Sequence, residues 1–485
     1  MKTADSLPLS PVSTEPGTFR TWAVVGCAGS LGLALTGTRV GSIPDPGHML
    51  WWFAVPDAGD VVLGLLFYLS VTLLVIAWLG VGQRARSGAL TTKQAWLLLG
   101  LWAIPLALGP PLFSRDLYSY MGQGLVAHSG LDPYAVGPAV LGPGHVLGSI
   151  ASVWRKTPAP YGPLFVAGTR GIAALFGRAI TAEVVALRVL ELLGVAMVMR
   201  YLPRLARTIG VDAGTALWLG VLSPLALFSF VASGHNDALM LGLLVAGLAL
   251  AAEGRLVLAL VLCGLATAVK LPAAVAVVFI AASRLRPRQG RQRLSTLATV
   301  VGVPAATVAL VTWASGFGWT WLSLGALHVP ADLRVLPTPS VAVGNMFTAV
   351  LHVVRIHVRQ DTVVRVTQVV LGVLALAVVA WLVLQVRTTN VVRLTGLALM
   401  VVVLAGPTVW PWYLLWGLLP LAATPAQRSK VLAAAAALGM LVVGPSGTPI
   451  LQGGLYIVVV LGCAVGCAWL VRGRRWHGIV TADVV

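Results

Sequence analysis

The sequence predicts an all-α polytopic integral membrane protein, and three observations support this fold class: the apolar composition, the length of the apolar runs and the position of the basic residues. The chain has 485 residues, of which 58% are hydrophobic and only 10% are charged, and its mean hydropathy is +0.91. Soluble domains carry roughly 25% charged residues. The apolar residues form continuous runs of roughly 20 residues, a length that crosses a bilayer as a helix. Continuous rather than alternating runs favour helices over a β-barrel.

The net charge of +18 does not indicate nucleic-acid binding, because the basic residues cluster in short loops between apolar runs. Loops 82–93 and 284–293 are two such segments, and basic loops are typical of the cytoplasmic side. Loop 82–93 predicts flanking spans at 59–81 and 94–113, after a first span at 22–38. The N-terminus is then cytoplasmic, and the chain emerges on the outer side after residue 113.

Two segments depart from simple crossing helices. Segment 255–284 has basic loops at both ends, so it must cross twice or enter the bilayer and return, with its bend at Lys270. Segment 340–354 is short for a crossing and is typical of a partly inserted external helix. We therefore expect about 12 crossings, with re-entrant or hairpin helices and an external amphipathic helix in addition. The expected organisation is a disordered cytoplasmic N-terminus at 1–20, one transmembrane domain at 21–475 with external loops 114–162 and 317–339 near the active site, and a cytoplasmic tail at 476–485.

The acidic residues gather on the outer side in this topology, although acidic residues contribute little to orientation. Long external loops are uncommon in compact bundles unless they are functional. An outward-facing polar site is therefore expected. The aspartates on that side are Asp45, Asp57, Asp60, Asp116, Asp132, Asp237 and Asp332.

The stretch "SRDLYSYMGQGLVAHSG" follows the third span and has apolar residues at helical spacing, which predicts an amphipathic helix in the outer interface. Asp116 then lies at the positive end of that helix, where a carboxylate stays ionised and can accept a proton from a hydroxyl. The alternative is that Asp116 is only a helix cap and Arg115 only a flanking anchor. This fragment alone favours the alternative.

Turn-rich segments with aromatic residues follow, in "GLDPYAVGP" and "WRKTPAPYGPLF". Tyr134, Trp154 and Tyr161 could stack on sugar rings, and Arg155 and Lys156 could bind an anion. An ordinary aromatic belt with basic anchors is the alternative, but it does not explain the density of prolines.

"SGHNDALM" brings His235, Asn236 and Asp237 to the start of a helix at an outer turn. These residues could bind a sugar hydroxyl, a phosphate or a metal. Adjacent residues on a helix splay apart, so polar binding or capping is favoured over a metal site. Lys270 lies in the apolar "AVKLPAAVA" and could hold a phosphate, since an intramembrane charge is functional by default. "GPTVWPWYLLW" forms a possible wall for a sugar or lipid with Trp410, Trp412 and Tyr413.

Several motifs are missing from the sequence, namely GxxxxGK[ST], HExxH, GxSxG and DxD. Their absence disfavours ATP hydrolysis, zinc proteolysis and serine esterase chemistry. We predict no certain cofactor and no metal ligand, and a divalent metal remains possible but unsupported by a DxD pair. Cysteines in apolar runs are typical of buried hydrophobic residues rather than disulfides. They are Cys27, Cys263, Cys463 and Cys467.

Taken together and in order, these motifs resemble the polyprenol-phosphomannose-dependent α-1,6-mannosyltransferases of actinobacterial lipomannan and lipoarabinomannan synthesis, the MptA/MptB type. The resemblance covers most of the chain, from the second span to "WPWYLLW". It implies the GT-C fold and mannose transfer from polyprenyl-phosphate-mannose to the 6-hydroxyl of a growing α-1,6-mannan. It also implies a multi-pass protein of the plasma membrane with an extracytoplasmic active site. The implied partners are the lipid-linked donor, the mannan or lipoglycan acceptor and membrane lipid, with no nucleic acid.

The resemblance implies an inverting single displacement with Asp116 as the catalytic base, since related GT-C enzymes carry an acid in the first large outer loop. The residues expected to bind the donor phosphate are Lys270, Arg115, Arg155 and Lys156. Sugar or acceptor binding falls to His235, Asn236, Asp237, Tyr118, Tyr134, Trp154, Tyr161, Trp410, Trp412 and Tyr413. No second carboxylate adjoins Asp116, unlike GT-C members with paired acids. The alternatives are another GT-C enzyme, such as an α-1,2-mannosyltransferase or an arabinosyltransferase, a lipid-linked glycan transporter or flippase, and a non-catalytic scaffold.

Overall fold

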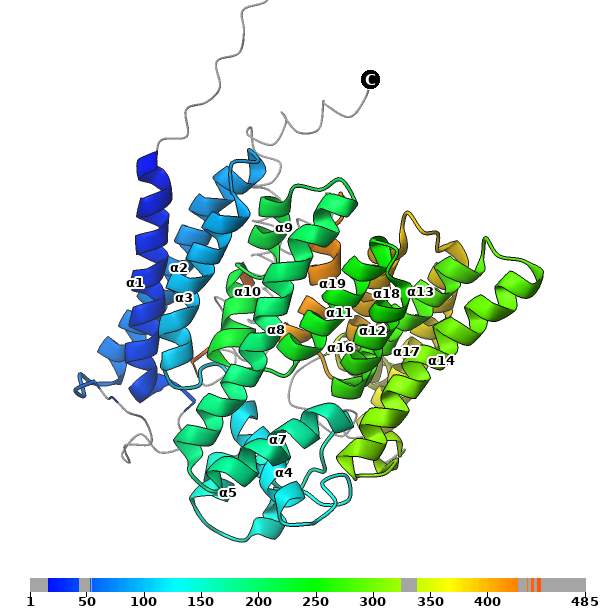
Figure 1. Cartoon of the computed structure of the whole chain (residues 1–485). Coiled ribbons are helices and arrows are strands. Elements are labelled where there is room, and N and C mark those ends of the chain that lie inside the picture. Colours follow the sequence, from blue (N-terminus) through cyan, green and yellow to red (C-terminus); the bar gives the residue numbers. More distant parts are fainter. Residues whose placement is uncertain are drawn as a thin grey trace, which may run out of the picture.

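The computed structural model describes residues 16–42, 53, 55–323, 338–425, 434, 438–439 and 443–445, and these form a helical bundle (Figure 1). The expected segments 1–20, 317–339 and 476–485 lie wholly or partly outside the described residues. The helices of the first half are α1 (Pro16–Val40), α2 (Asp60–Arg86), α3 (Thr92–Leu108), α4 (Asp116–His128), η1 (Pro138–Leu141), α5 (His145–Ser149), α6 (Ser152–Arg155), α7 (Pro163–Phe176) and α8 (Ile180–Thr208). Those of the second half are α9 (Ala213–Leu219), α10 (Pro224–Ala226), η2 (Leu227–Ala232), α11 (Asp237–Ala252), α12 (Leu256–Val269), η3 (Leu271–Ala273), α13 (Ala274–Leu285), α14 (Gly290–Ser315), η4 (Thr320–Leu322), α16 (Pro339–Val353), α17 (Gln360–Gln385), α18 (Val391–Ala405), η5 (Pro411–Tyr413) and α19 (Leu414–Ala422).

The first three predicted spans correspond to α1, α2 and α3. α3 starts at a capping box, in which the Thr91 hydroxyl accepts from the Gln94 N–H while the Gln94 side chain accepts from the Thr91 N–H. It ends at Leu108, five residues before the predicted boundary at 113. Pro110 and Pro111 follow, and the residue before a proline is disfavoured in helical conformation, so the chain leaves the helix early.

The described helices are those of a membrane protein. Four are long and apolar enough to cross a bilayer, and a bent pair, Ala213–Leu219 with Pro224–Ala232, could form a fifth span. Shorter apolar helices include α3, α7, α11, α12, α16 and α18. The prediction of about 12 crossings and of a GT-C bundle stays a prediction.

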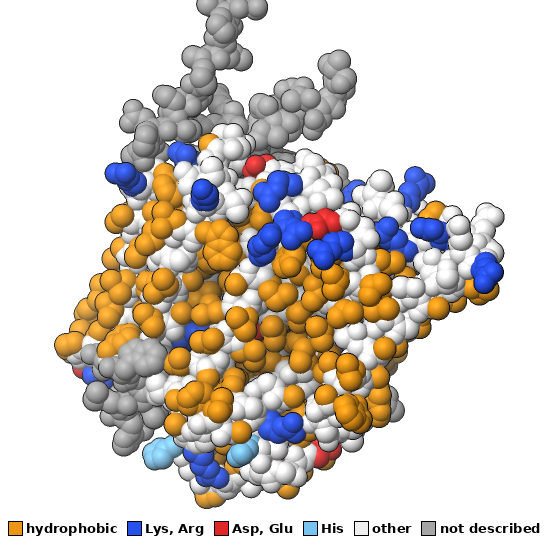
Figure 2. Space-filling view, in the orientation of Figure 1, with side chains coloured by type: hydrophobic (Ala, Val, Ile, Leu, Met, Phe, Trp, Pro, Cys, Tyr) orange, Lys and Arg blue, Asp and Glu red, His pale blue; other side chains and the backbone are white. Residues whose placement is uncertain are grey.

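Two contacts show which loops share a face. The Arg284 guanidinium donates to the carbonyl of Ala251, so α13 ends beside the end of α11. The Arg286 guanidinium donates to the carbonyl of Val386 over 3.0 Å, which places the end of α17 there too. Figure 2 shows most visible Lys and Arg side chains at this end of the molecule, above a broad apolar belt. α12 and α13 therefore enter and return from one face and meet at Lys270, as the charge pattern predicted.

The segment predicted to be an external amphipathic helix does form a helix, α4. This helix is not exposed at the membrane interface. Every residue from Asp116 to Ala127 is buried. α7, α8 and η1 pack around α4, so its polar residues face protein rather than water. The prediction was wrong in this respect because the covering segments are distant in sequence and leave no periodic signal in α4 itself.

Candidate active site

The site forms where two helix breaks meet, one between α3 and α4 and the other between η2 and α11. The Leu112 N–H donates to the Ala232 carbonyl over 3.2 Å, and the Ser233 hydroxyl donates to the Leu112 carbonyl over 2.8 Å. Phe113 has a φ of 64°, uncommon for a residue other than glycine, and its ring stacks on Phe228 at 4.7 Å. These contacts bring the first residues of α4 and α11, both aspartates, into one region.

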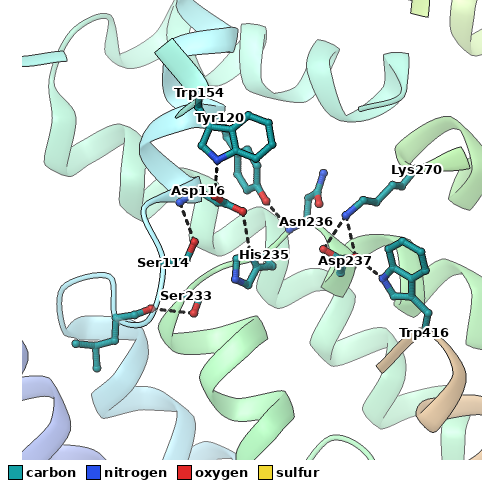
Figure 3. A network of polar contacts seen from close by, with 11 residues as sticks. Ser114, Asp116, Tyr120, Trp154, Ser233, His235, Asn236, Asp237, Lys270 and Trp416 are labelled. Carbon is teal, nitrogen blue, oxygen red and sulfur yellow. Dashed lines mark hydrogen bonds and ion pairs between the residues drawn. The ribbon is translucent and has the colours of Figure 1, made fainter. Parts of the chain in front are cut away.

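Asp116 is the first of these aspartates, and its carboxylate has a partner on each side (Figure 3). The Trp154 indole N–H donates to Asp116 Oδ1 over 3.1 Å. His235 Nδ1 lies 3.3 Å from Asp116 Oδ2, at ion-pair distance but without the alignment of a hydrogen bond. The Asp116 N–H donates to the Ser114 hydroxyl over 3.1 Å. The Asp116 side chain keeps 12% exposure, so the carboxylate is oriented while it remains accessible.

A stack of aromatic rings holds His235 in place. The His235 ring is fully buried and lies 3.6 Å from the Trp412 ring, at an interplanar angle of 18°. Trp412 stacks in turn on Trp410 at 4.9 Å and 8°. His235, Trp412 and Trp410 therefore form one continuous group of stacked rings. The structure places His235 against Asp116, which the sequence did not predict.

Asp237, the first residue of α11, pairs with Lys270 in the second half of the site. Lys270 Nζ lies 3.0 Å from each carboxylate oxygen, and the Trp416 indole N–H also donates to Asp237. The ammonium lies 4.6 Å from the Tyr413 ring centroid, 5.2 Å from that of Trp416 and 5.7 Å from that of Tyr161. The pair is thus enclosed by aromatic faces, which attract cations.

The two carboxylates therefore differ in what they can do. Asp237 is fully buried, and both of its oxygens are bound to a cation. Asp116 is partly exposed, and its partners are an indole and an imidazole. Asp116 is therefore the carboxylate that is more accessible to a ligand hydroxyl.

Asn236 lies between the two carboxylates (Figure 3). Its side chain is fully buried, and neither its Oδ1 nor its Nδ2 has a hydrogen-bond partner among the described residues. Its backbone N–H makes a long contact of 3.5 Å to the Tyr120 hydroxyl, and the Tyr120 ring packs edge-on against Tyr161. A buried amide without partners is costly unless a ligand or water satisfies it, so Asn236 is suited to bind a polar ligand.

Tyr120 and Trp416 are site residues that sequence reasoning missed. Tyr120 is four residues after Asp116 on α4, so helical spacing could have identified it. Trp416 has the same spacing from Trp412. Their partners lie far away in sequence, since Trp416 contacts Asp237 and Tyr120 contacts Asn236.

The basic residues predicted to bind phosphate differ in what they contact. Arg155 donates to the carbonyls of Ile150 and Gly148, over 3.0 and 3.3 Å, and so braces its own loop. Lys156 is exposed. Arg115 adjoins Asp116, is half-buried and makes no ion pair with the described residues. Among the cations that could still bind an anion, Arg115 is therefore the one nearest in sequence to the Asp116 carboxylate.

Two predicted tyrosines lie away from the carboxylates. Tyr134 is buried with its ring edge-on to Phe317 at 5.8 Å, and burial raises the pKa of its hydroxyl. Tyr118 is buried on α4, and its charged neighbours are Arg188 and Arg115. Tyr161, in contrast, contacts the site, and burial also raises the pKa of its hydroxyl. Tyr134 and Tyr161 are therefore neutral at physiological pH.

The described part of the chain contains no group of three His, Cys, Asp or Glu residues suited to a metal.

Gly162 sets the distance between Tyr161 and the Lys270 bend. Its N–H donates to the Val269 carbonyl over 2.9 Å, and a Cβ here would lie 2.1 Å from the Ala268 carbonyl oxygen. We predict that Gly162→Ala destabilises the protein by about 1–3 kcal/mol, as overpacking does, and lowers activity by shifting Tyr161. Thermal unfolding in detergent measures the effect. Gly171→Ala on the adjacent α7, where a Cβ meets no atom within 4 Å, is the matched control and should be neutral.

The fold and site define an integral membrane protein with a largely buried acidic site at two helix breaks. The family model described as "Alpha-(1->6)-mannopyranosyltransferase, N-terminal domain" matches residues 23–286, and the "MptB C-terminal domain" model matches residues 340–473. The chain belongs to this α-(1→6)-mannopyranosyltransferase family. Four side chains contact the carboxylates of Asp116 and Asp237. Trp154, His235 and Lys270 lie within the N-terminal match, and Trp416 lies within the C-terminal match.

Curated relatives match the chain over half to nearly all of its length. The chain is 33% identical to alpha-(1->6)-mannopyranosyltransferase A of Mycobacterium tuberculosis over 472 residues, which cover 93% of this chain and 90% of the relative. It is 34% identical to a probable alpha-(1->6)-mannopyranosyltransferase of Mycolicibacterium smegmatis, with 84% of this chain and 79% of the relative covered. It is 32% identical to alpha-(1->6)-mannopyranosyltransferase A of Corynebacterium glutamicum over 53% of this chain and 58% of the relative. No solved structure matches the chain.

Proposed function

We propose that this protein is a GT-C glycosyltransferase that moves mannose from polyprenyl-phosphate-mannose to the 6-hydroxyl of a growing α-1,6-mannan of the lipomannan or lipoarabinomannan type. It acts at the extracytoplasmic face of the plasma membrane. The family and the names of its relatives support mannosyl transfer. The observation that carries the chemistry is the Asp116 carboxylate, which is oriented by Trp154 and His235 and pairs with no ammonium or guanidinium group of the described residues.

The proposed reaction is an inverting single displacement. The acceptor oxygen forms a bond to the anomeric carbon while the bond from that carbon to the phosphate oxygen breaks. Polyprenyl phosphate leaves with the electron pair, and Asp116 accepts the proton of the acceptor hydroxyl. Trp154 and His235 hold the two carboxylate oxygens in one orientation, which reduces the reorganisation that the proton transfer requires.

Charge on the leaving phosphate needs a cation, and Arg115 is the best placed. It is half-buried beside Asp116, and its guanidinium can bind a phosphate through two N–H groups. Lys270 has two of its three N–H donors directed at Asp237, so one donor remains for a phosphate oxygen. Asn236 has an unpaired donor and an unpaired acceptor, which suit a sugar hydroxyl.

The decisive experiment is incubation of the purified protein with polyprenyl-phosphate-mannose and a short α-1,6-mannoside, followed by linkage analysis. An α-1,6-linked product that depends on the lipid donor supports the proposal. An α-1,2 linkage, or transfer of arabinose instead of mannose, would assign a different GT-C activity. Movement of the lipid across a vesicle membrane without a new glycosidic bond would assign a transporter.

His235 is predicted to act through Asp116. Replacing it with Leu removes the contact with Asp116 Oδ2 and should lower kcat by about 100-fold, the cost of misplacing a reacting group by roughly 1 Å. His235→Asn keeps an amide near the position of Nδ1 and should restore part of the rate. In an Asp116→Asn background, His235→Leu should change the residual rate little, because coupled residues are non-additive. Steady-state assays of the variants measure this, and additive losses would contradict it.

A further inference from the structure

α16 and α17 form a hairpin with an apolar groove along it. The groove has a volume of about 590 Å³. Val343, Phe347 and Leu351 line it from α16, at intervals of four residues, and Val363, Val366 and Val370 line it from α17. Only 6% of the most apolar stretch of α17 is buried, against 44% in α2, so the groove adjoins a helix that faces lipid. Its lining therefore suits a hydrocarbon chain.

One end of the hairpin is basic. Arg359 lines the groove and lies at the start of α17, Arg355 lies in the preceding turn, and Arg365 follows one turn into the helix. All three are exposed, and Asp361 is the acidic residue among them. The groove thus combines an apolar body with a cationic mouth, which is the complement of an anionic amphiphile.

This basic end lies on the side where membrane proteins carry few basic residues. The opposite end of α17 meets Arg286 of the basic loop 284–293, since the Arg286 guanidinium donates to the Val386 carbonyl. A helix of 26 residues is about 39 Å long, enough to cross the bilayer, so Arg355 and Arg359 lie on the other, outer side. The preference of basic loops for the cytoplasmic side explains the arginines near the end of α17 that contacts Arg286. It does not explain Arg355 and Arg359 at the outer end, which require another reason.

We propose that this groove binds an anionic phospholipid of the outer leaflet, with an acyl chain between α16 and α17 and the phosphate at Arg355 and Arg359. Guanidinium groups bind phosphate oxygens in pairs of hydrogen bonds, and hydrocarbon burial holds the chain. The sugar donor is a poorer fit, because α16 and α17 pack on each other and on α13 and α18, none of which carries a residue of the carboxylate site. The lipid would brace the hairpin rather than react.

The test uses native mass spectrometry of the full chain in neutral detergent, titrated with phosphatidylglycerol and, for comparison, phosphatidylcholine. Phosphatidylglycerol should bind more tightly. Each basic residue near an anionic lipid contributes about a five-fold gain in affinity, so Arg355→Gln with Arg359→Gln should weaken binding roughly 25-fold. Arg291→Gln with Arg293→Gln, two exposed arginines of the opposite face, is the matched control and should leave this binding unchanged.

A second pair of variants tests the groove itself. Val366→Trp fills the groove and should reduce phosphatidylglycerol binding. Val369→Trp, at a similarly exposed position of α17 outside the lining, should not. Equal affinity for both phospholipids, or unchanged binding in the Arg355/Arg359 variant, would overturn the proposal. Displacement of phosphatidylglycerol by much tighter binding of polyprenyl phosphate would reject the phospholipid and reassign the groove to the donor lipid.

Discussion

Asp116→Asn should lower mannosyl transfer by about 100- to 10,000-fold, the usual cost of losing a general base. The substitution removes the charge and the proton-accepting oxygen but hardly changes side-chain volume. The Trp154 indole can still donate to the remaining Oδ1, so the fold should be kept. Because the base acts in the transition state, kcat and kcat/KM should fall together with little change in KM. Initial rates with polyprenyl-phosphate-mannose and a short mannoside measure the effect.

Asp132→Asn is the matched control for this prediction. Asp132 is an outer aspartate whose Oδ1 accepts from the Tyr134 N–H, a role that an asparagine also performs. It should retain the rate of the natural sequence. Near-normal transfer by a folded Asp116→Asn protein would remove Asp116 from the role of base. Asp237 would then be the carboxylate to test next, despite its pairing with Lys270.

The sequence predicted the parts of the fold that depend on local composition and charge. The apolar runs located α1 and α2, and the two basic loops around 255–284 placed a bend at Lys270, which the break between α12 and η3 confirms. Helix starts were also visible, since Asp116 and Asp237 open α4 and α11. Hydropathy could not show that α4 is covered on every side, because its covering helices are supplied by other parts of the chain.

The residues of the site were predicted from the sequence, but the contacts between them were not. Asp116, His235, Asp237 and Lys270 were all singled out from sequence, and the structure brings them together. Their pairing was not predictable, because each contact joins positions far apart in sequence. The structure adds two contacts that were not predicted: His235 contacts Asp116, and Lys270 binds Asp237. A lone charge in an apolar run indicates a functional position but does not identify its partner.

Lys270→Met should destabilise the protein by about 3–5 kcal/mol, because it leaves the fully buried Asp237 carboxylate without its cation. Met fills a volume similar to that of the lysine chain, so the loss reports charge rather than a cavity. The Trp416 N–H would be the remaining donor to Asp237 and could not neutralise it. Transfer activity should also fall sharply, since Asn236 lies between the two carboxylates and its position depends on the start of α11. Thermal unfolding in detergent, together with the transfer assay, measures both effects.

A double variant distinguishes the ion pair from a simple packing effect. Replacing a buried pair by two apolar residues is often neutral, so Asp237→Leu added to Lys270→Met should recover much of the lost stability. It should not recover activity, because the Lys270 N–H available to a phosphate is absent in both proteins. Lys93→Met, at an exposed lysine of α3, should change neither property. A Lys270→Met protein as stable as the natural sequence would show that the charge pair is not what holds α11 against the Lys270 bend.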